Sequence, residues 1–496
     1  MAKRTKVVAV VAGAALAVAI AVTVGWRAHR KNTVPIGFVV AMQALDDGAV
    51  LAWRAGDENP DGRHGYVSRV DVHGHTLWWA RIPDDPLTGD SLAVGDGIVA
   101  VRYSHHTPQA MFGDDQSLVA FRLADGRPLW DRKLATVKPF EDTYAEASLN
   151  VYSSAAFVGD RLLEWVDRDK DGNVIDVIAP QTGDVVAERP WNDDASATVV
   201  VGQHLFQHEA LRVRSLDVPS AQVSVFETRG TGCAIDGEYV TIERQDEHAM
   251  LVAYPGGDRS KRRVIKDSFD PRPQGNAYVS WMLRSCGRYH DRLVLAIEED
   301  TEPGDSDRLV VVASRAGDIL HVITLPHDSS WDGESMTRKY YDHASLAGEL
   351  TRFVPYIVIA HDGDNELRQL VMLDLEQGTI AWSSQPDDKL LDAHLFRGTD
   401  RWYLVSGFIE DVVTVFDGAT GQIAEAAQAH AYEGIVQIKP AHISGGRLWV
   451  ASQEHERVDH APVAIFDARS LQPALVTKEI SVKNLTAAQT SKLLGK

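Results

Sequence analysis

The chain has 496 residues, a length that either several ordinary domains or one large repeat architecture can use. It carries 70 acidic and 50 basic residues, and because six of the basic residues and none of the acidic ones lie in residues 1–31, the remaining chain has 44 basic residues and a balance of −26. A domain with this charge repels nucleic acid and anionic lipid, so the composition excludes nucleic acid as a partner.

The first predicted element is a membrane anchor. A basic segment, residues 1–6, precedes an uninterrupted apolar run of 19 residues from Val7 to Gly25, and Trp26 and further basic residues follow. As a helix this run is about 28 Å long, close to the ~30 Å hydrocarbon core of a bilayer. The run is longer than the apolar region of most cleaved signal peptides, so we expect residues 1–31 to be an uncleaved signal anchor. The sequence thus predicts a single-pass membrane protein whose following domain lies outside the cytoplasm, in the periplasm or at the cell surface.

Residues 66–477, within a predicted domain of residues 38–479, repeat one pattern. A short apolar strand, a polar turn with Gly or Asp and a second strand recur, most clearly in LVAFRLADGRPLW (118–130), LVMLDLEQGTIAW (370–382) and VTVFDGATGQIAE (413–425). Such alternation around a turn predicts a β-hairpin. A second hairpin precedes each copy, as in AFVGDRLLEWV (156–166). Four strands that recur about every 35 to 65 residues are typical of the blades of a β-propeller.

The number of repeats predicts the size of the propeller. We place eight units, and a compact ninth around VVVGQHLFQHEALRVRSLDV (199–218) is less regular. The expected fold is therefore all-β, a β-propeller of about eight four-stranded blades, with a range of seven to nine. Residues 480–496 form a C-terminal tail, which either closes the ring or reaches a partner.

The hairpins end in a motif with a Trp. Asp374, Gly378 and Trp382 form the pattern D-x-x-x-G-x-x-x-W, and a shorter version ends at Trp130. This motif resembles that of the pyrroloquinoline-quinone (PQQ) type, or quinoprotein-like, propellers. In that family the Trp at the end of the outer hairpin docks between neighbouring blades. The resemblance implies the same role for Trp79, Trp130 and Trp382.

The resemblance implies one of two functions. Some members of the family are quinone-dependent dehydrogenases, whereas others are noncatalytic and bind proteins, as in outer-membrane assembly. The dehydrogenases carry two adjacent cysteines at the cofactor and often a C-x-x-C-H haem motif, and this chain has neither. We therefore expect a protein-binding or scaffolding module of the cell envelope, without quinone and without assigned catalytic residues. The alternative is an enzyme, either dehydrogenase-like or using carboxylates at the propeller channel.

An acidic loop predicts either a turn or a calcium site. Asp167, Asp169 and Asp171 alternate in the sequence DRDKDG, between the second and third strands of one unit. In the first interpretation these carboxylates accept backbone hydrogen bonds in a solvated turn. In the second they converge on Ca²⁺, with Asp176 as a further ligand, because calcium requires six to eight oxygen atoms.

The two cysteines, Cys233 and Cys286, occupy similar places on the first strands of successive units. In adjacent blades such positions can approach within the ~7 Å between Cα atoms that a disulfide requires, and an exported domain permits the bond. The sequence is compatible with either a disulfide or a pair of buried free thiols.

Overall fold

The structure of the chain is a computed structural model. It describes residues 37–55, 65–86, 92–105, 115–136, 155–167, 173–190, 198–209, 212–227, 232–245, 248–272, 280–300, 308–326, 348–362, 365–385, 390, 394–406, 412–431, 441–444, 446–451, 454–455, 463–476, 480–486 and 489. These residues are called the described residues.

The described residues form nine antiparallel sheets. The first sheet contains β1 (Gly37–Leu45), β2 (Gly48–Ala55), β3 (Gly65–Asp71) and β4 (Thr76–Arg81), and the second contains β5 (Asp85–Pro86), β6 (Leu92–Gly95), β7 (Ile98–His105), β8 (Asp115–Arg122) and β9 (Pro128–Thr136). The third contains β10 (Ala155–Val158), β11 (Arg161–Asp167), β12 (Asn173–Ile178) and β13 (Val185–Pro190), and the fourth β14 (Thr198–Val201), β15 (His204–Glu209), β16 (Arg212–Asp217) and β17 (Gln222–Glu227).

The other five sheets follow in chain order. The fifth contains β18 (Gly232–Ile235), β19 (Glu238–Gln245), β20 (His248–Pro255) and β21 (Arg263–Lys266), with a 3-10 helix, η2 (Arg259–Lys261), before β21; the sixth contains β22 (Ser280–Tyr289), β23 (Arg292–Asp300), β24 (Arg308–Ala313) and β25 (Ile319–Thr324). The seventh contains β26 (Phe353–Asp362), β27 (Asn365–Asp374) and β28 (Thr379–Ser383), the eighth β29 (His394–Arg397), β30 (Arg401–Ser406), β31 (Val412–Asp417) and β32 (Ile423–Ala431), and the ninth β33 (Ala441–Ser444), β34 (Arg447–Ala451), β36 (Val463–Asp467) and β37 (Pro473–Val476).

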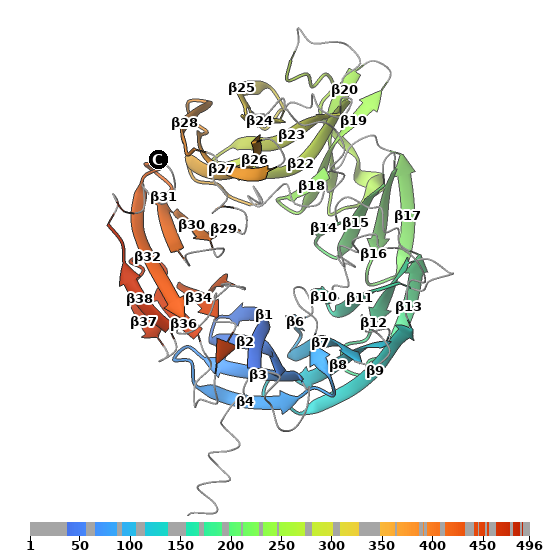
Figure 1. The fold of residues 1–496 in the computed structure, drawn as a ribbon. Coiled ribbons are helices and arrows are strands. Elements are labelled where there is room, and N and C mark those ends of the chain that lie inside the picture. Colours follow the sequence, from blue (N-terminus) through green and yellow to red (C-terminus); the bar gives the residue numbers. More distant parts are fainter. Residues whose placement is uncertain are drawn as a thin grey trace, which may run out of the picture.

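The sheets are arranged as a ring in chain order (Figure 1). First strands such as β6, β10, β14 and β18 lie toward the centre, and fourth strands such as β9, β13 and β17 lie at the rim. Buried side chains fill the contact between neighbouring sheets, which we call a seam. In the seam of the first and second sheets, for example, Val50 and Val67 pack with Val99 and Val119. Each sheet therefore depends on its neighbours for burial of its apolar faces, as expected of a repeat fold.

The predicted all-β fold is confirmed, and the number of sheets is at the upper end of the predicted range rather than eight. The additional sheet is the fourth, β14–β17, which contains the irregular unit at residues 199–218. Its outer hairpin turns at Ala221 with φ of 53°, where the second and eighth sheets have Gly126 and Gly421 with φ of 71° and 65°. A positive φ favours glycine, so the glycine turn signal is missing here, as it is at Leu471 of the ninth sheet, where φ is 49°.

The ring closes by packing the first sheet against the ninth. Val39 and Trp53 of the first sheet share an apolar cluster with Trp449 and Ile465 of the ninth. A short strand, β35 (Glu454–His455), also pairs with the start of β1. The ends of the repeat thus meet through side chains and through backbone pairing.

The tail contributes a strand to the eighth sheet. β38 (Ile480–Asn484) pairs antiparallel with β32, from Ala427 opposite Asn484 to Ala431 opposite Ile480. The start of the predicted tail therefore forms a fifth strand at the rim of the ring.

The predicted anchor, residues 1–31, lies outside the described residues. Within the described ranges, no helix is both long enough and apolar enough to cross a membrane.

Candidate functional site

Two of the predicted Trp residues bridge the seam to the following sheet. Trp130 of β9 donates from Nε1 to the carbonyl oxygen of Pro180 at 2.8 Å, and a Cβ at Gly183 would lie 2.6 Å from the Trp130 ring. Trp382 of β28 likewise donates from Nε1 to the carbonyl oxygen of Gly421 at 2.9 Å. At the Trp130 seam the glycine turn of the next sheet makes room for the indole ring, which is a reason for glycine beyond its positive φ.

In the first sheet the docking residue is Trp78 and not the predicted Trp79. The Nε1 atom of Trp78 donates to the carbonyl oxygen of Leu123 at 2.9 Å, and a Cβ at Gly126 would lie 2.5 Å from its ring. Trp79 packs on the opposite face of the sheet, edge-on to Tyr66 with 5.5 Å between ring centroids.

The reason for the correction is a β-bulge. The β3–β4 register shifts between Arg69 and Val70, which face Trp78 and Thr76, so Leu77 is the extra residue and Trp78 takes the docking face. The same two-residue step separates Pro128 from Trp130 across the bulge in β9. Spacing from the turn glycine, four residues from Gly74 to Trp78, was the sequence signal for the right residue.

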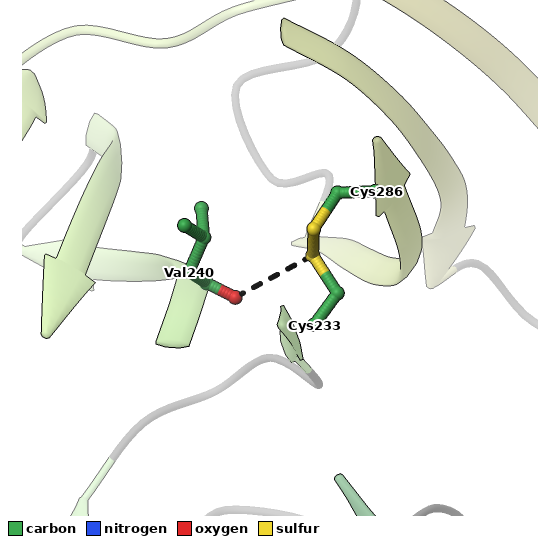
Figure 2. The surroundings of a disulfide bond; sticks show 3 residues. All are labelled: Cys233, Val240 and Cys286. Atoms are coloured by element: carbon green, nitrogen blue, oxygen red, sulfur yellow. Dashed lines mark hydrogen bonds between the residues drawn. A yellow bond between two sulfur atoms is a disulfide. The ribbon is translucent and has the colours of Figure 1, made fainter. Parts of the chain in front are cut away.

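The seam between the fifth and sixth sheets contains a disulfide (Figure 2). Cys233 of β18 and Cys286 of β22 are joined with 1.97 Å between Sγ atoms and 5.8 Å between Cα atoms. Sγ of Cys233 also lies 3.8 Å from the carbonyl oxygen of Val240, a van der Waals contact, because a disulfide sulfur has no hydrogen to donate. Both cysteines are buried, 6% and 1% exposed, so the bond links the inner strands of two sheets inside the apolar core.

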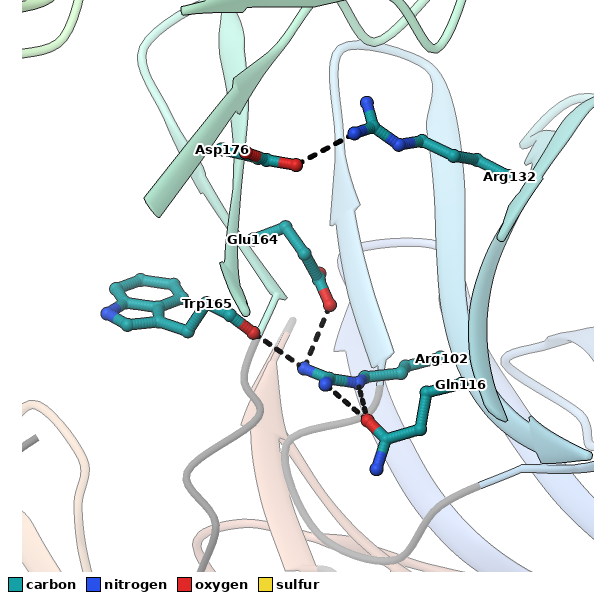
Figure 3. A network of polar contacts seen from close by, with 6 residues as sticks. All are labelled: Arg102, Gln116, Arg132, Glu164, Trp165 and Asp176. Carbon is teal, nitrogen blue, oxygen red and sulfur yellow. Dashed lines mark hydrogen bonds and ion pairs between the residues drawn. The ribbon is translucent and has the colours of Figure 1, made fainter. Parts of the chain in front are cut away.

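A buried polar network occupies the seam between the second and third sheets (Figure 3). Arg102 of β7 and Glu164 of β11 form an ion pair with 2.9 Å between Nη1 and Oε1, and their side chains are 2% and 0% exposed. Arg102 also donates from Nη1 to the carbonyl oxygen of Trp165 at 2.9 Å and from Nε to Oε1 of Gln116 at 2.8 Å. The guanidinium group is thus held by three partners from two sheets.

Glu164 is less well satisfied than Arg102. Its 2.9 Å contact lacks hydrogen-bond geometry, and neither carboxylate oxygen has a hydrogen-bond partner among the described residues. Burial raises the pKa of Glu164 to about 7, although the charge of Arg102 acts in the opposite direction. Burial likewise lowers the pKa of Arg102, opposed by Glu164. The pair therefore changes its charge state near neutral pH.

The predicted calcium ligands are placed only in part. Asp167 ends β11, and Asp169 and Asp171 fall in residues 168–172, outside the described residues. Asp176 lies within β12 opposite Glu164, and its Oδ2 accepts a hydrogen bond from Nη2 of Arg132 at 2.8 Å. The side chain of Asp176 is directed into the seam (Figure 3). Calcium binding by the four aspartates stays a prediction.

No group of three or more His, Cys, Asp or Glu side chains within the described ranges is arranged to hold a metal ion.

Exposed turns use aspartates as backbone acceptors. Oδ1 of Asp467 accepts from the N–H groups of Arg469 and Ser470, and the same pattern occurs at Asp417 with Ala419 and Thr420. The hydrogen bonds from Ser470 and Arg469 keep the pKa of Asp467 below its usual value. Burial opposes the effect at Asp417, but the bonds from Thr420 and Ala419 still keep its pKa low. These carboxylates have a structural role in the hairpins.

Sequence reasoning missed Arg102 and Glu164, which belong to no motif. The signal was a charge on a strand face that is otherwise apolar: Leu162, Glu164 and Val166 alternate on one buried face of β11. Residues at alternate positions share a face, so a charged residue in such a series is expected to be buried and paired.

Comparisons with known proteins give similar folds at low sequence identity. No protein-family model and no curated protein matches the chain. Similar solved structures include BamB from Moraxella catarrhalis (TM-score 0.43, 13% identity, covering 87% of this chain and 97% of that one) and a quinohemoprotein alcohol dehydrogenase from Comamonas testosteroni (0.41, 10%, 90% and 77%). A third is Sqt1 from Saccharomyces cerevisiae (0.38, 10%, 86% and 96%). The predicted resemblance to quinoprotein-like propellers is thus found among solved structures. At these values the likeness assigns no activity, ligand or partner.

Proposed function

We propose that this chain is a noncatalytic protein-binding ring that acts as a scaffold. The observation that carries the proposal is a set of similar sheets whose connecting segments differ in length and sequence. The segments that connect the second and third strands differ in length and sequence, as residues 56–64 in the first sheet, 246–247 in the fifth and 301–307 in the sixth show. A repeated set of sheets with connections of different length and sequence is typical of binding modules.

The roles of the carboxylates support a binding function over a catalytic one. Glu164, the buried carboxylate with the raised pKa, lies in a seam at 0% exposure, where a substrate has no access to it. The aspartates whose pKa is lowered at Asp417 and Asp467 are engaged with turn N–H groups. Perturbed pKa values mark active sites in many enzymes, but here each of these three groups has a structural explanation.

The setting that we propose is the cell envelope. Residues 1–31 would hold the ring at a membrane as a single-pass anchor, with the ring outside the cytoplasm and envelope assembly as its process. Labelling of cells whose outer layers have been opened and whose cytoplasmic membrane is intact, with a membrane-impermeant amine reagent, tests this orientation. Lysines of the ring, such as Lys266, should react without lysis, whereas reaction only after lysis would contradict the proposal.

The binding function is tested by recovery of partners from membranes. The full chain is purified after cross-linking, beside a matched variant in which residues 301–307 are replaced by the two-residue turn Asn-Gly. The proposal expects reproducible protein partners with the parent chain, and fewer with the variant if that connection contributes to binding. Recovery of the chain alone, at equal expression and thermal stability, would contradict the scaffold function.

A separate measurement tests the alternative that the chain is an enzyme. A quinone-dependent or carboxylate enzyme would retain a small molecule or turn one over, so mass spectrometry and absorbance of the purified chain are informative. A bound quinone would contradict the noncatalytic function as proposed here.

Calcium is a separate proposal for the loop that begins at Asp167. Alternating carboxylates at Asp167, Asp169 and Asp171 supply hard oxygen ligands, and Asp176 would join them only by leaving Arg132. Melting temperature in calcium and in chelator tests it. We expect a higher melting temperature with calcium, which Asp169→Ala abolishes, whereas equal melting of the parent chain in both buffers would show that the loop is only an acidic turn.

A further inference from the structure

The outer strands of the sheets differ in one respect, their register. Eight of them shift register against the neighbouring strand of their sheet: β4, β9, β13, β21, β25, β28, β32 and β37. Among the outer strands that the structure describes, β17 alone pairs without a shift, residue for residue from Gln222 opposite Asp217 to Glu227 opposite Arg212. The fourth sheet therefore has a regular outer edge, at the right of the ring in Figure 1.

A regular edge is open to further pairing. Bulges bend and twist an edge strand, which hinders pairing with another chain, and Lys or Pro on the edge has the same effect. The sequence of β17, QVSVFE, contains neither residue. Within the described residues, β17 has β16 on one side and no strand on the other.

The backbone groups of alternate β17 residues face outward. In an antiparallel ladder the N–H and C=O groups of one residue point to the same side, and successive residues alternate. The carbonyl oxygen of Val225 accepts from Nη1 of Arg259, in the next sheet, at 3.3 Å, which places Val225 and its alternate Val223 on the outward side. The Val225 side chain is 44% exposed, whereas that of Val223 packs into the seam with the third sheet.

The chain itself shows what a fifth strand looks like. β38 adds antiparallel to the outer edge of β32, with the sequence ISVKN, in which β-branched Ile480 and Val482 alternate with polar residues. The pairing lies in the half of β32 beyond its register shift, which falls near Phe416 and Val415. The outer edge of a sheet in this ring is therefore suited to strand addition where it is regular.

We propose that the outer edge of β17 is a strand-addition site for an extended segment of a partner protein, which pairs antiparallel and alternates β-branched with polar residues. This deepens the proposed scaffold function and rests on it for the existence of a partner. The incoming strand takes the place of Arg259 at the Val225 carbonyl oxygen and sets an apolar side chain beside Val225. A second copy of the chain fits less well, because it would bring its own Arg189 and Arg259 to the edge and oppose like charges.

The test uses a synthetic peptide with the sequence of residues 478–486, KEISVKNLT, and the full chain, with hydrogen exchange as the readout. We expect the peptide to slow exchange in residues 222–227 and not in the bulged edges β13 and β25. Val225→Pro, which removes an outward N–H, should weaken peptide binding about tenfold or more. Val225→Thr keeps the N–H and the β-branched shape and is expected to bind as the parent does, and Arg259→Ala to bind equally or more tightly.

Several outcomes would overturn the proposal. These are no slowing in residues 222–227 at saturating peptide, equal slowing in β13 and β25, slowing confined to β32, and unchanged binding by a folded Val225→Pro chain. Concentration-dependent protection of residues 222–227 without peptide, together with a dimer in sedimentation, would assign the edge to a second copy and also overturn it.

Failure of this site and failure of the scaffold function are distinguishable. If Val225→Pro recovers the same membrane partners as the parent chain, the strand-addition site is wrong and the scaffold function stands. If the parent chain recovers no partner although the peptide protects residues 222–227, the scaffold function fails and the edge remains a peptide site.

Discussion

Two seams of the ring are fastened in different ways. Between the second and third sheets, the buried pair Arg102–Glu164 sits among backbone and amide partners. Between the fifth and sixth sheets, the disulfide Cys233–Cys286 sits in an apolar cluster. The first seam adds an ion pair to its apolar packing and the second adds a covalent bond, although the strands on either side are arranged alike.

The comparison shows that the repeat specifies the position of the sheets but not the chemistry between them. A buried ion pair requires both partners, because a single charge left in a seam lacks the solvent that would stabilise it. A disulfide adds stability by restricting the unfolded chain and does not titrate. The first seam should therefore respond to pH and the second to reductant.

The largest loss of stability is expected from removing one partner of the buried ion pair Arg102–Glu164. Arg102→Leu leaves Glu164 buried without a counter-charge and should lower the free energy of unfolding by about 3–5 kcal/mol at pH 8. The loss should be smaller at pH 5, where Glu164 takes up a proton. Urea unfolding at both pH values measures it, and the double variant Arg102→Leu/Glu164→Leu should regain most of the stability; an equal loss at both pH values would contradict the account.

The parent chain should show the matching pH dependence. Because burial raises the pKa of Glu164 from its usual value of 4.5 to about 7, the folded state holds a proton that the unfolded state releases. The contribution of Glu164 is thus fully favourable below about pH 4.5 and declines as pH rises toward 7, by at most ~1.4 kcal/mol per pH unit. Comparison with Glu164→Gln isolates this slope, which the variant should lack.

Removal of the disulfide should give the next largest loss of stability. Replacing both cysteines, by Cys233→Ala with Cys286→Ala, should lower the free energy of unfolding by about 2–4 kcal/mol, to a similar extent at pH 5 and pH 8. Reductant should destabilise the parent chain and leave the double variant unchanged. A strong pH dependence of this loss would remove the distinction between the two seams.

Changes at the Trp residues that bridge two sheets should have a smaller effect on the free energy of unfolding. Trp78→Phe removes the hydrogen bond from Nε1 to Leu123 and should cost about 1 kcal/mol in thermal or urea unfolding. Trp79→Phe is the matched control, because Nε1 of Trp79 is buried without a hydrogen-bond partner among the described residues. Its removal should be neutral or slightly stabilising, and the reverse order of the two variants would restore Trp79 as the docking residue.

The smallest effect is expected outside the seams, in the turns. Asp417→Ala loses the hydrogen bonds from Ala419 and Thr420 and should cost roughly 1 kcal/mol at pH 7. Since the folded pKa of Asp417 is below its usual value, its contribution is present above about pH 4 and is lost as pH falls further. Acid titration of both proteins should therefore show the difference vanish near pH 2, and a difference that persists there would contradict the role of the carboxylate.

The sequence predicted the repeated sheets well, because alternation and glycine turns are local signals. It predicted the fourth sheet only as a less regular ninth unit, and there Ala221 rather than glycine turns the outer hairpin at positive φ. It was wrong by one residue at Trp79, because a bulge changes which side chain faces the second sheet. The partners of Arg102 and Asp176 could not be predicted, since they come from neighbouring sheets about 44 to 63 residues apart in the sequence.

The most direct test of the proposed scaffold function is the native mass of the complex released from cross-linked membranes with the full chain. We expect the mass of this chain plus at least one other polypeptide, with no bound small molecule. A mass equal to the chain alone with a quinone-sized addition would contradict the account and favour an enzyme.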